Sequence, residues 1–168
     1  IHSHGAYGFD TNDGKEEGLR NWIKRLPADE GVTSFLPTTI TQSVEVLSNA
    51  VANVAKVVRD GYEGANVLGI NFEGPYLDMK YKGAQPEEHI LPTSVEQFKM
   101  YQDKADGLIK IITLAPEHDE NMQLTKYCSQ NGVAVSLGHS SATYETAVVA
   151  AANGAKLLTH VYNGMTPY

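Results

Sequence analysis

Apolar residues in this chain gather in short runs that alternate with stretches of helical periodicity. The runs are rich in β-branched residues and alternate poorly between polar and apolar positions, which is typical of strands buried on both faces of a parallel sheet. They cover residues 32–36, 66–72, 108–114, 133–137 and 156–161. The repeated order of strand and helix predicts an α/β fold with a parallel sheet and right-handed crossovers.

Helical signals fill the segments between these runs. Three expected helices are each followed by a glycine just beyond the end: residues 44–58 with Gly61, 120–131 with Gly132, and 142–153 with Gly154. Thr93 and Glu96 have the spacing of a capping box and predict the start of a further helix. No tandem repeat or long linker interrupts this order, so we expect a single structural unit.

Nearly every apolar run ends in residues that carry chemistry or form turns. A TIM barrel places such residues around its active site, at the C-terminal ends of its parallel strands. A doubly wound open sheet can do the same at a switch point, but rarely from almost every strand. We therefore expect a partial TIM (β/α)8-type barrel of about six βα units. The run ends are His2-Ser3-His4-Gly5, Leu36-Pro37-Thr38-Thr39, Phe72-Glu73-Gly74-Pro75, Ala115-Pro116-Glu117, Gly138-His139-Ser140 and Thr159-His160-Val161-Tyr162-Asn163.

Chain length affects the expected domain organisation. A full barrel has eight strands and typically about 250 residues, whereas this chain has 168 residues. It opens at the end of its first expected strand and stops just after the sixth. We expect residues 1–168 to form an incomplete barrel domain, with the last barrel strands outside this chain. An open arc of strands leaves unpaired edges, which the remaining strands or a partner would cover.

Composition narrows the classes of function. The chain is 42% hydrophobic and 20% charged, as in globular domains. Its net charge is −7 and it has no basic cluster, which disfavours a nucleic-acid partner. No apolar run approaches the roughly 18 to 20 residues of a membrane span, so no membrane partner is expected. The single cysteine, Cys128, cannot form an internal disulfide, which favours a cytoplasmic location.

Five of the residues at run ends have side chains that bind metal ions. His2 and His4 are two positions apart, a spacing that points both side chains to one face of a strand. Glu73, His139 and His160 follow three further runs at equivalent points. A single histidine or carboxylate at a strand end is more often structural, but the recurrence in successive βα units favours a metal site. The nitrogen and oxygen ligands suit Zn²⁺ or Fe²⁺.

Together these motifs resemble the amidohydrolase superfamily and, within it, the N-acetylglucosamine-6-phosphate deacetylases. The pair of histidines alone indicates only the superfamily. The remaining series is specific to this deacetylase family and its close relatives, and it spans the whole chain in the family's order. The matching segments are residues 31–38, Phe72-Glu73-Gly74-Pro75-Tyr76, Leu114-Ala115-Pro116-Glu117, Gly138-His139-Ser140 and Thr159-His160-Val161-Tyr162-Asn163-Gly164-Met165.

The resemblance implies roles for the metal-binding residues. Glu73, His139 and His160 match the principal metal ligands of the family. His2 and His4 match a pair that is kept in members able to hold a second ion. The resemblance therefore implies one or two divalent ions, with Glu73 bridging when there are two.

The resemblance also implies substrate contacts and partners. Ala84 and Gln85 match a loop that contacts the sugar phosphate, although Gln85 stands where some members have a histidine. Asn163 and Gly164 match residues that approach the phosphate, partly through backbone groups. An amino-sugar phosphate is the implied small-molecule substrate, and a homodimer is implied for the full-length protein.

The implied activity is metal-dependent hydrolysis of the N-acetyl group of N-acetyl-D-glucosamine 6-phosphate to glucosamine 6-phosphate and acetate. The family's catalytic aspartate, which takes up the proton and delivers it to the leaving amine, would lie beyond Tyr168. A phosphate-binding arginine and the accessory β-sandwich domain of the family are also expected outside this chain. We therefore expect no catalytic residue in residues 1–168 and no turnover by this chain alone.

Two alternatives stay open at this point. The first is another amidohydrolase, such as a deacetylase for a different amino sugar or a dihydroorotase-like enzyme. Glu73 argues against relatives that bridge metals with a carboxylated lysine, since no lysine occupies that position. The second is a catalytically inactive piece that binds metal or sugar phosphate.

Overall fold

Five strands form one parallel sheet in the computed structural model, which describes residues 1–167. Tyr168, where the expected domain ends, lies outside the described residues. The strands follow the order β4–β6–β7–β8–β9, so each lies beside its predecessor in the sheet. This order lacks the reversal that a doubly wound fold requires, and it confirms the predicted parallel α/β fold. The bounds are β4 Thr38–Thr39, β6 Ile70–Glu73, β7 Ile109–Leu114, β8 Ala134–Leu137 and β9 Ala155–Leu158.

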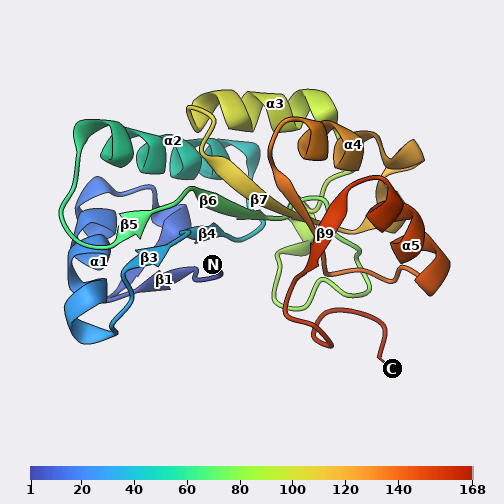
Figure 1. Cartoon of the computed structure of the whole chain (residues 1–168), viewed down its shortest axis with the longest axis horizontal. Coiled ribbons are helices and arrows are strands. Elements are labelled where there is room, and N and C mark those ends of the chain that lie inside the picture. The colour runs from blue at the N-terminus through green and yellow to red at the C-terminus, as the bar shows by residue number, and fades with distance from the viewer. Residues whose placement is uncertain (168) are drawn as a thin grey trace.

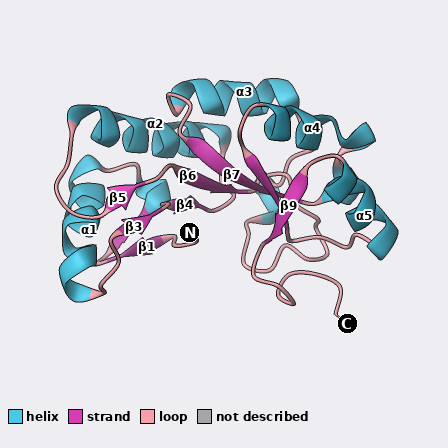
Figure 2. Cartoon of the chain, viewed as in Figure 1, coloured by secondary structure: helices cyan, strands magenta, loops and turns pink. Residues whose placement is uncertain are grey.

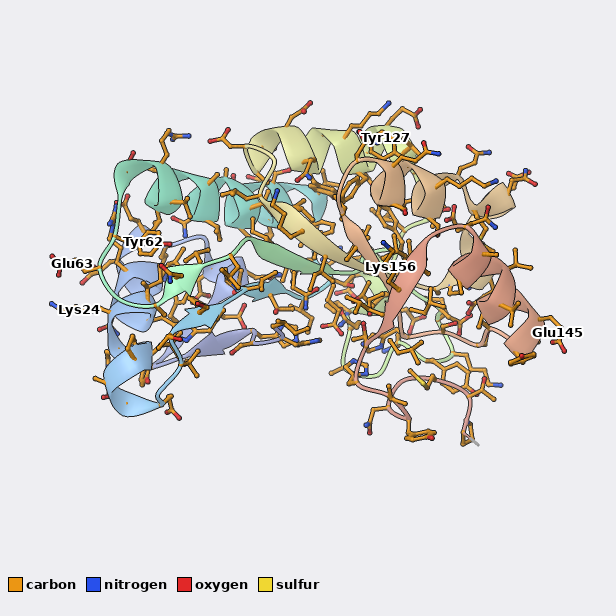
Figure 3. All side chains as sticks on the ribbon, in the orientation of Figure 1. Lys24, Tyr62, Glu63, Tyr127, Glu145 and Lys156 are labelled. Carbon is orange, nitrogen blue, oxygen red and sulfur yellow. The ribbon has the colours of Figure 1, made fainter. Side chains whose placement is uncertain are left out.

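Within residues 1–167, five α-helices connect the strands (Figure 1). Helices α2 to α5 lie along the outer side of the sheet, and α1 packs against α2 at one end of the molecule. Figure 2 shows most of the long loops on the side away from α2 and α3. The labelled charged side chains Lys24, Glu63 and Glu145 point outward at the two ends of the molecule (Figure 3). None of the described helices combines the length and the apolar character needed to cross a bilayer. The bounds are α1 Glu16–Asp29, α2 Val44–Asp60, α3 Val95–Lys104, α4 Gln123–Gln130 and α5 Tyr144–Ala152.

The hydrophobic core lies between the sheet and the helices. Phe72 of β6 is fully buried, with its ring 4.9 Å from that of Tyr101 and 6.4 Å from that of Phe98, both in α3. Successive side chains of a strand point to opposite faces. Packing of Phe72 under α3 therefore turns the next side chain, Glu73, away from the helices.

One predicted strand is split into two pieces, and another is shorter than predicted. The run 66–72 forms β5 (Asn66–Val67) and β6, which are separated at Gly69. Gly69 has a φ of 145°, and a Cβ there would come within 2.3 Å of a lysine side chain in β7. Only glycine fits this bend. The run 32–36 contains β3 (Ser34–Phe35), which pairs with β5 in a separate two-stranded parallel sheet.

The first predicted strand is present only as an isolated parallel bridge between Ser3 and Pro37. Ser3 N donates to Thr38 Oγ1, and Thr38 N donates to Ser3 O, each at 2.9 Å. The N-terminal segment thus lies alongside β4 without forming a strand there. The chain then turns into an antiparallel hairpin of β1 (Gly5–Ala6) and β2 (Phe9–Asp10).

The predicted capping box at Thr93 and Glu96 is wrong by one position. Helix α3 begins after Ser94, whose Oγ accepts a hydrogen bond from Gln97 N at 3.1 Å. Thr93 instead donates its hydroxyl to His118 O at 2.9 Å. The hydroxyl of Thr93 is therefore used in a contact with the next βα loop, and its neighbour caps the helix.

Two helical segments differ from the expectation. The expected helix over 120–131 opens with a 3-10 turn, Glu120–Met122, in which Asn121 has a φ of 53°, and it becomes α4 only afterwards. Helix α1 was not among the predicted elements. Its buried face consists of residues at helical spacing, namely Leu19, Trp22, Ile23 and Leu26.

We predict that Phe72→Ala in the native protein lowers the free energy of unfolding by about 3–5 kcal/mol, because it leaves a cavity under α3. Urea unfolding followed by circular dichroism measures this change. Val148→Ala on α5, where the side chain is 47% exposed, is the matched control and should change stability by less than about 0.5 kcal/mol. A loss of only about 0.5 kcal/mol for Phe72→Ala would contradict the described packing.

Candidate metal centre

Glu73 lies at the centre of four histidine side chains. Its own side chain is only 2% exposed. Oε2 lies 3.4 Å from His2 Nε2 and 3.1 Å from His4 Nε2. Oε1 lies 3.0 Å from His139 Nε2 and 3.1 Å from His160 Nε2. The structure thus brings together all five residues that the sequence indicated as metal ligands.

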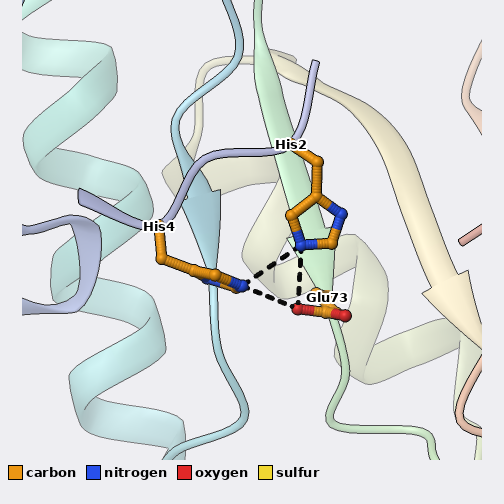
Figure 4. A group of neighbouring side chains, drawn as sticks. All are labelled: His2, His4 and Glu73. Atoms are coloured by element: carbon orange, nitrogen blue, oxygen red, sulfur yellow. Dashed lines mark hydrogen bonds and ion pairs between the residues drawn. The ribbon is translucent and has the colours of Figure 1, made fainter. Parts of the chain in front are cut away.

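The parallel sheet explains why residues so far apart in the sequence meet. Glu73 ends β6, and its register partner is Thr113 of β7, which pairs in turn with Ser136 of β8. His139 and His160 lie two residues beyond the ends of β8 and β9. The C-terminal ends of parallel strands share one edge, where barrel enzymes place their functional groups. Figure 4 shows the remaining two histidines reaching Glu73 from the N-terminal segment.

Three of the four histidine rings are fixed through their second nitrogen, which contacts a backbone carbonyl. A carbonyl only accepts hydrogen bonds, so in the neutral ring Nδ1 carries the proton and donates it. Nε2 is then left with a lone pair that points into the cluster, the arrangement found in metal-binding histidines. The contacts are His4 Nδ1 to Thr38 O at 3.2 Å, His139 Nδ1 to Tyr81 O at 2.9 Å and His160 Nδ1 to Asn163 O at 2.8 Å.

The Nε2 atoms also face one another in pairs. Those of His2 and His4 are 3.2 Å apart, and those of His139 and His160 are 3.1 Å apart. Two lone pairs at this separation repel unless a proton or a cation lies between them. Each pair forms a group with Glu73 in which the ligand atoms lie within 4.8 Å of one another. Two nitrogens and a carboxylate oxygen on each side fit a divalent metal ion.

Charge couples the members of the cluster. Burial by itself would raise the pKa of Glu73, but hydrogen bonds from His139, His2 and His4, donated when their Nε2 atoms are protonated, outweigh burial and hold this pKa well below its usual value. The hydrogen bond to Glu73 raises the pKa of His4. Burial lowers the pKa of His139, yet its contacts with Glu73 and Tyr81 raise it overall. Glu73 is therefore ionised and attracts protons or cations to the histidines.

A layer of buried hydroxyl groups lies in the sheet next to the cluster. Thr159 Oγ1 is 2.8 Å from Thr113 Oγ1 and 2.7 Å from Ser136 Oγ. A Cβ at Gly138 would lie 2.7 Å from Thr159 Cβ, so the end of β8 approaches this layer as closely as only glycine allows. An opening of about 170 Å³ adjoins this layer and is also lined by His160. The cluster is thus accessible from the inner face of the sheet.

The two segments that were expected to contact a sugar phosphate both approach His139. A Cβ at Gly164, where φ is 62°, would lie 3.0 Å from His139 Nδ1. A Cβ at Gly83, next to Ala84, would lie 3.6 Å from His139 Cε1. Ala84 and Asn163 are both exposed. The segments therefore flank the cluster on the side of His139.

Gln85 is placed differently from its neighbour Ala84. It is only 3% exposed, and its Oε1 accepts a hydrogen bond from Thr41 N at 2.8 Å. This contact ties the loop after β6 to the loop after β4. The side-chain oxygen of Gln85 thus holds in place the loop that carries Ala84.

Several groups around the cluster had no assigned role in the sequence. The carbonyls that orient the histidines belong to the backbone and leave no mark in the sequence pattern. Asp78, Glu117 and His118 form a further group whose ligand atoms lie within 4.8 Å of one another. Burial would raise the pKa of Asp78, but hydrogen bonds from His118 and Ser141 hold it below its usual value. Only Glu117 belonged to a recognised motif.

Comparison with known proteins identifies relatives of this chain. No family model matches the chain. The chain is 44% identical to N-acetylglucosamine-6-phosphate deacetylase of Bacillus subtilis (strain 168), over all of this chain and 43% of that protein. It is 35% identical to N-acetylgalactosamine-6-phosphate deacetylase of Escherichia coli O157:H7, over 98% of this chain and 44% of that protein.

A solved structure shares the fold. The crystal structure of N-acetyl-D-glucosamine-6-phosphate deacetylase from Mycobacterium smegmatis matches with a TM-score of 0.91 at 27% identity, over 99% of this chain and 43% of that one. A mutant of that enzyme in complex with N-acetyl-D-glucosamine-6-phosphate gives a TM-score of 0.90. The chain is a homologue of the N-acetylglucosamine-6-phosphate deacetylases. It spans less than half the length of the relatives it matches, and its parallel α/β fold corresponds to part of their TIM barrel.

We predict that Gly164→Ala in this deacetylase homologue weakens binding of a divalent ion such as Co²⁺ by about 10-fold or more, because the new methyl group presses on the ring of His139. Gly132→Ala is the matched control, since its φ is 75° but its Cβ would meet nothing within 4 Å. Both variants should lose about 1–2 kcal/mol of stability through their positive φ. Titration against a chelator measures the affinity. Equal affinity in the two variants would show that Gly164 does not confine the ring.

Proposed function

We propose that this chain carries the metal centre of an enzyme that hydrolyses the N-acetyl group of N-acetyl-D-glucosamine 6-phosphate, releasing glucosamine 6-phosphate and acetate. The proposal rests on one observation, the convergence of four imidazole Nε2 atoms on the two oxygens of Glu73. The 44% identity to a deacetylase named for this substrate supports the reaction. The nitrogen and oxygen ligands support Zn²⁺ or Fe²⁺, as one ion or as two ions bridged by Glu73.

A divalent ion held here would supply Lewis acidity, which lowers the pKa of a water molecule to about 7 and polarises an amide carbonyl. The residues of the chain bind and orient. Glu73 provides the negative charge, and backbone carbonyls keep the lone pairs of His4, His139 and His160 directed inward. Rings held in this way need little rearrangement when a metal ion binds.

Proton transfer needs a further group. Within residues 1–167, the carboxylate inside the histidine cluster is that of Glu73, and both of its oxygens already face imidazole nitrogens. A general acid for the leaving amine must stand within hydrogen-bond reach of that nitrogen. By resemblance to the deacetylase family, we propose that an aspartate of the complete protein takes this role.

Four residues are proposed to contact the amino-sugar phosphate. Ala84 and Gln85 lie on the loop that reaches His139 through Gly83, while Asn163 and Gly164 follow His160. The exposure of Ala84 and Asn163 leaves room for a ligand beside the metal centre. Backbone at glycine can approach a phosphate closely because no side chain intervenes.

One comparison supports a second candidate substrate. The relative from Escherichia coli O157:H7 is named for N-acetylgalactosamine 6-phosphate. That sugar differs from N-acetylglucosamine 6-phosphate only at C4, away from the acetamide group, so the metal ligands alone do not discriminate between the two. The higher identity to the glucosamine enzyme, 44% against 35%, favours the first substrate.

We further propose a homodimer and a cytoplasmic location for the complete protein. The homodimer rests on the resemblance to the deacetylase family. The location is supported by Cys128, the single cysteine of the sequence, which is buried in α4. Burial raises the pKa of its thiol to about 12, so this cysteine serves packing rather than disulfide chemistry.

We predict that His139→Ala or His160→Ala in the full-length protein abolishes tight metal binding, because each removes one nitrogen from the same group of ligands. Elemental analysis of the purified protein gives the metal content. His89→Ala is the control, since His89 lies in the 3-10 turn Glu87–His89 and outside the cluster. Stoichiometric metal in both cluster variants would reject the metal centre.

Acetate release by the full-length protein tests the substrate. We expect turnover of N-acetylglucosamine 6-phosphate, slower turnover of the galactosamine isomer, and a kcat/KM about 100-fold lower for N-acetylglucosamine without phosphate, because binding energy from the remote phosphate is lost. This chain alone, if folded, should bind metal without turnover. The full-length protein could bind metal tightly and yet release no acetate from the 6-phosphate of either N-acetylglucosamine or N-acetylgalactosamine. That result would overturn the deacetylase function and leave the metal centre intact.

A further inference from the structure

His139 holds its ring in the metal cluster from an unusual backbone conformation. Its φ is 49°, in the left-handed region that residues other than glycine rarely adopt. Such a conformation persists only where the surrounding structure imposes it. One restraint is direct, because Asp78 N donates a hydrogen bond to His139 O at 2.8 Å. The other restraints come from the residues around it.

Glu117 binds both residues that follow His139. Ser140 Oγ donates to Glu117 Oε2 at 2.6 Å, and Ser141 N donates to Oε1 at 2.5 Å. The hydroxyl of Ser141 also lies 3.1 Å from Oε1. Glu117 belongs to the 3-10 turn Pro116–His118 after β7. The backbone that leaves His139 is therefore attached to the neighbouring βα loop through one carboxylate.

Asp78 restrains His139 from the other side. Its Oδ1 accepts a hydrogen bond from Tyr81 N at 3.2 Å. The turn formed in this way presents Tyr81 O to His139 Nδ1 at 2.9 Å. Asp78 Oδ2 lies 2.8 Å from His118 Nε2 and 3.1 Å from Ser141 Oγ. Since the hydroxyl of Ser141 contacts both carboxylates, the two restraints form one network.

We propose that Glu117 and Asp78 act together as positioning residues for His139. Glu117 fixes the backbone of His139, and Asp78 fixes the carbonyl that orients its ring. All four carboxylate oxygens accept hydrogen bonds from within the chain. Their use by these donors explains why two carboxylates lie so close together. This inference rests on the proposed metal centre, because the benefit of a fixed ring is the binding of an ion.

Titration of the full-length protein with Co²⁺ tests this inference, since visible absorption reports both affinity and ligand geometry. We expect Glu117→Ala to weaken Co²⁺ binding by about 10- to 100-fold and to shift the absorption band of the bound ion. Glu117→Gln keeps one oxygen for Ser141 and should lose less. Glu120→Ala removes an exposed carboxylate three positions further along the same segment and should match the wild type.

The results of the Co²⁺ titration distinguish the positioning role of Glu117 from the existence of the metal centre. A wild-type protein that binds no Co²⁺ would overturn the metal centre and the inference with it. Wild-type affinity and an unchanged absorption band in folded Glu117→Ala would overturn only the positioning role. If circular dichroism shows that Glu117→Ala is unfolded, Glu117→Gln decides, since an affinity and a band identical to those of the wild type would then reject the role.

Discussion

The buried carboxylate of Glu73 needs partners for its negative charge. An ionised group with a side chain only 2% exposed is costly to bury unless charges or hydrogen bonds compensate it. Here each oxygen faces two imidazole nitrogens, which come from the N-terminal segment and from the loops after β8 and β9. Those three places meet only where parallel strands end at a common edge. The requirement to compensate one charge thus links the order of the sheet to the chemistry of the site.

One face of β6 contributes to the hydrophobic core, and the other contributes to the metal cluster. Phe72 and Glu73 are adjacent, so burial of the first under α3 directs the second toward the histidines. The backbone then refines the geometry, because carbonyl groups decide which nitrogen carries the proton in the rings of His4, His139 and His160. Both His139 and Gly164 have left-handed backbone conformations. The ring of His139 thereby contacts the loop after β9, at a distance that a side chain on Gly164 would not allow. Precision at this site therefore comes from loops that are held by hydrogen bonds on both sides.

Much of the fold and most of the cluster could be predicted from the sequence because the signals are local. Apolar runs with poor alternation indicated buried parallel strands, and the residues after those runs indicated ligands at one edge. Two of the differences from the prediction have tertiary causes. The run over 66–72 is split because the backbone bends at Gly69 where β7 approaches, and Ser94 caps α3 because the hydroxyl of Thr93 bonds to a distant carbonyl. Helix α1 is absent from the prediction, although its buried residues follow ordinary helical spacing.

Residue type and periodicity are properties of short segments, so they suffice to show which side chains can bind a metal and that these side chains stand at strand ends. How the four histidines divide between the oxygens of Glu73, and which ring nitrogens face inward, depends on the three-dimensional arrangement of the loops. The same arrangement lets Glu117 and Asp78 restrain His139. The pair formed by Ser141 and Asp78 is separated by 63 residues in the chain. A contact of that kind depends on how separate strands place the two loops in space, and no short segment of sequence encodes the distance between those loops.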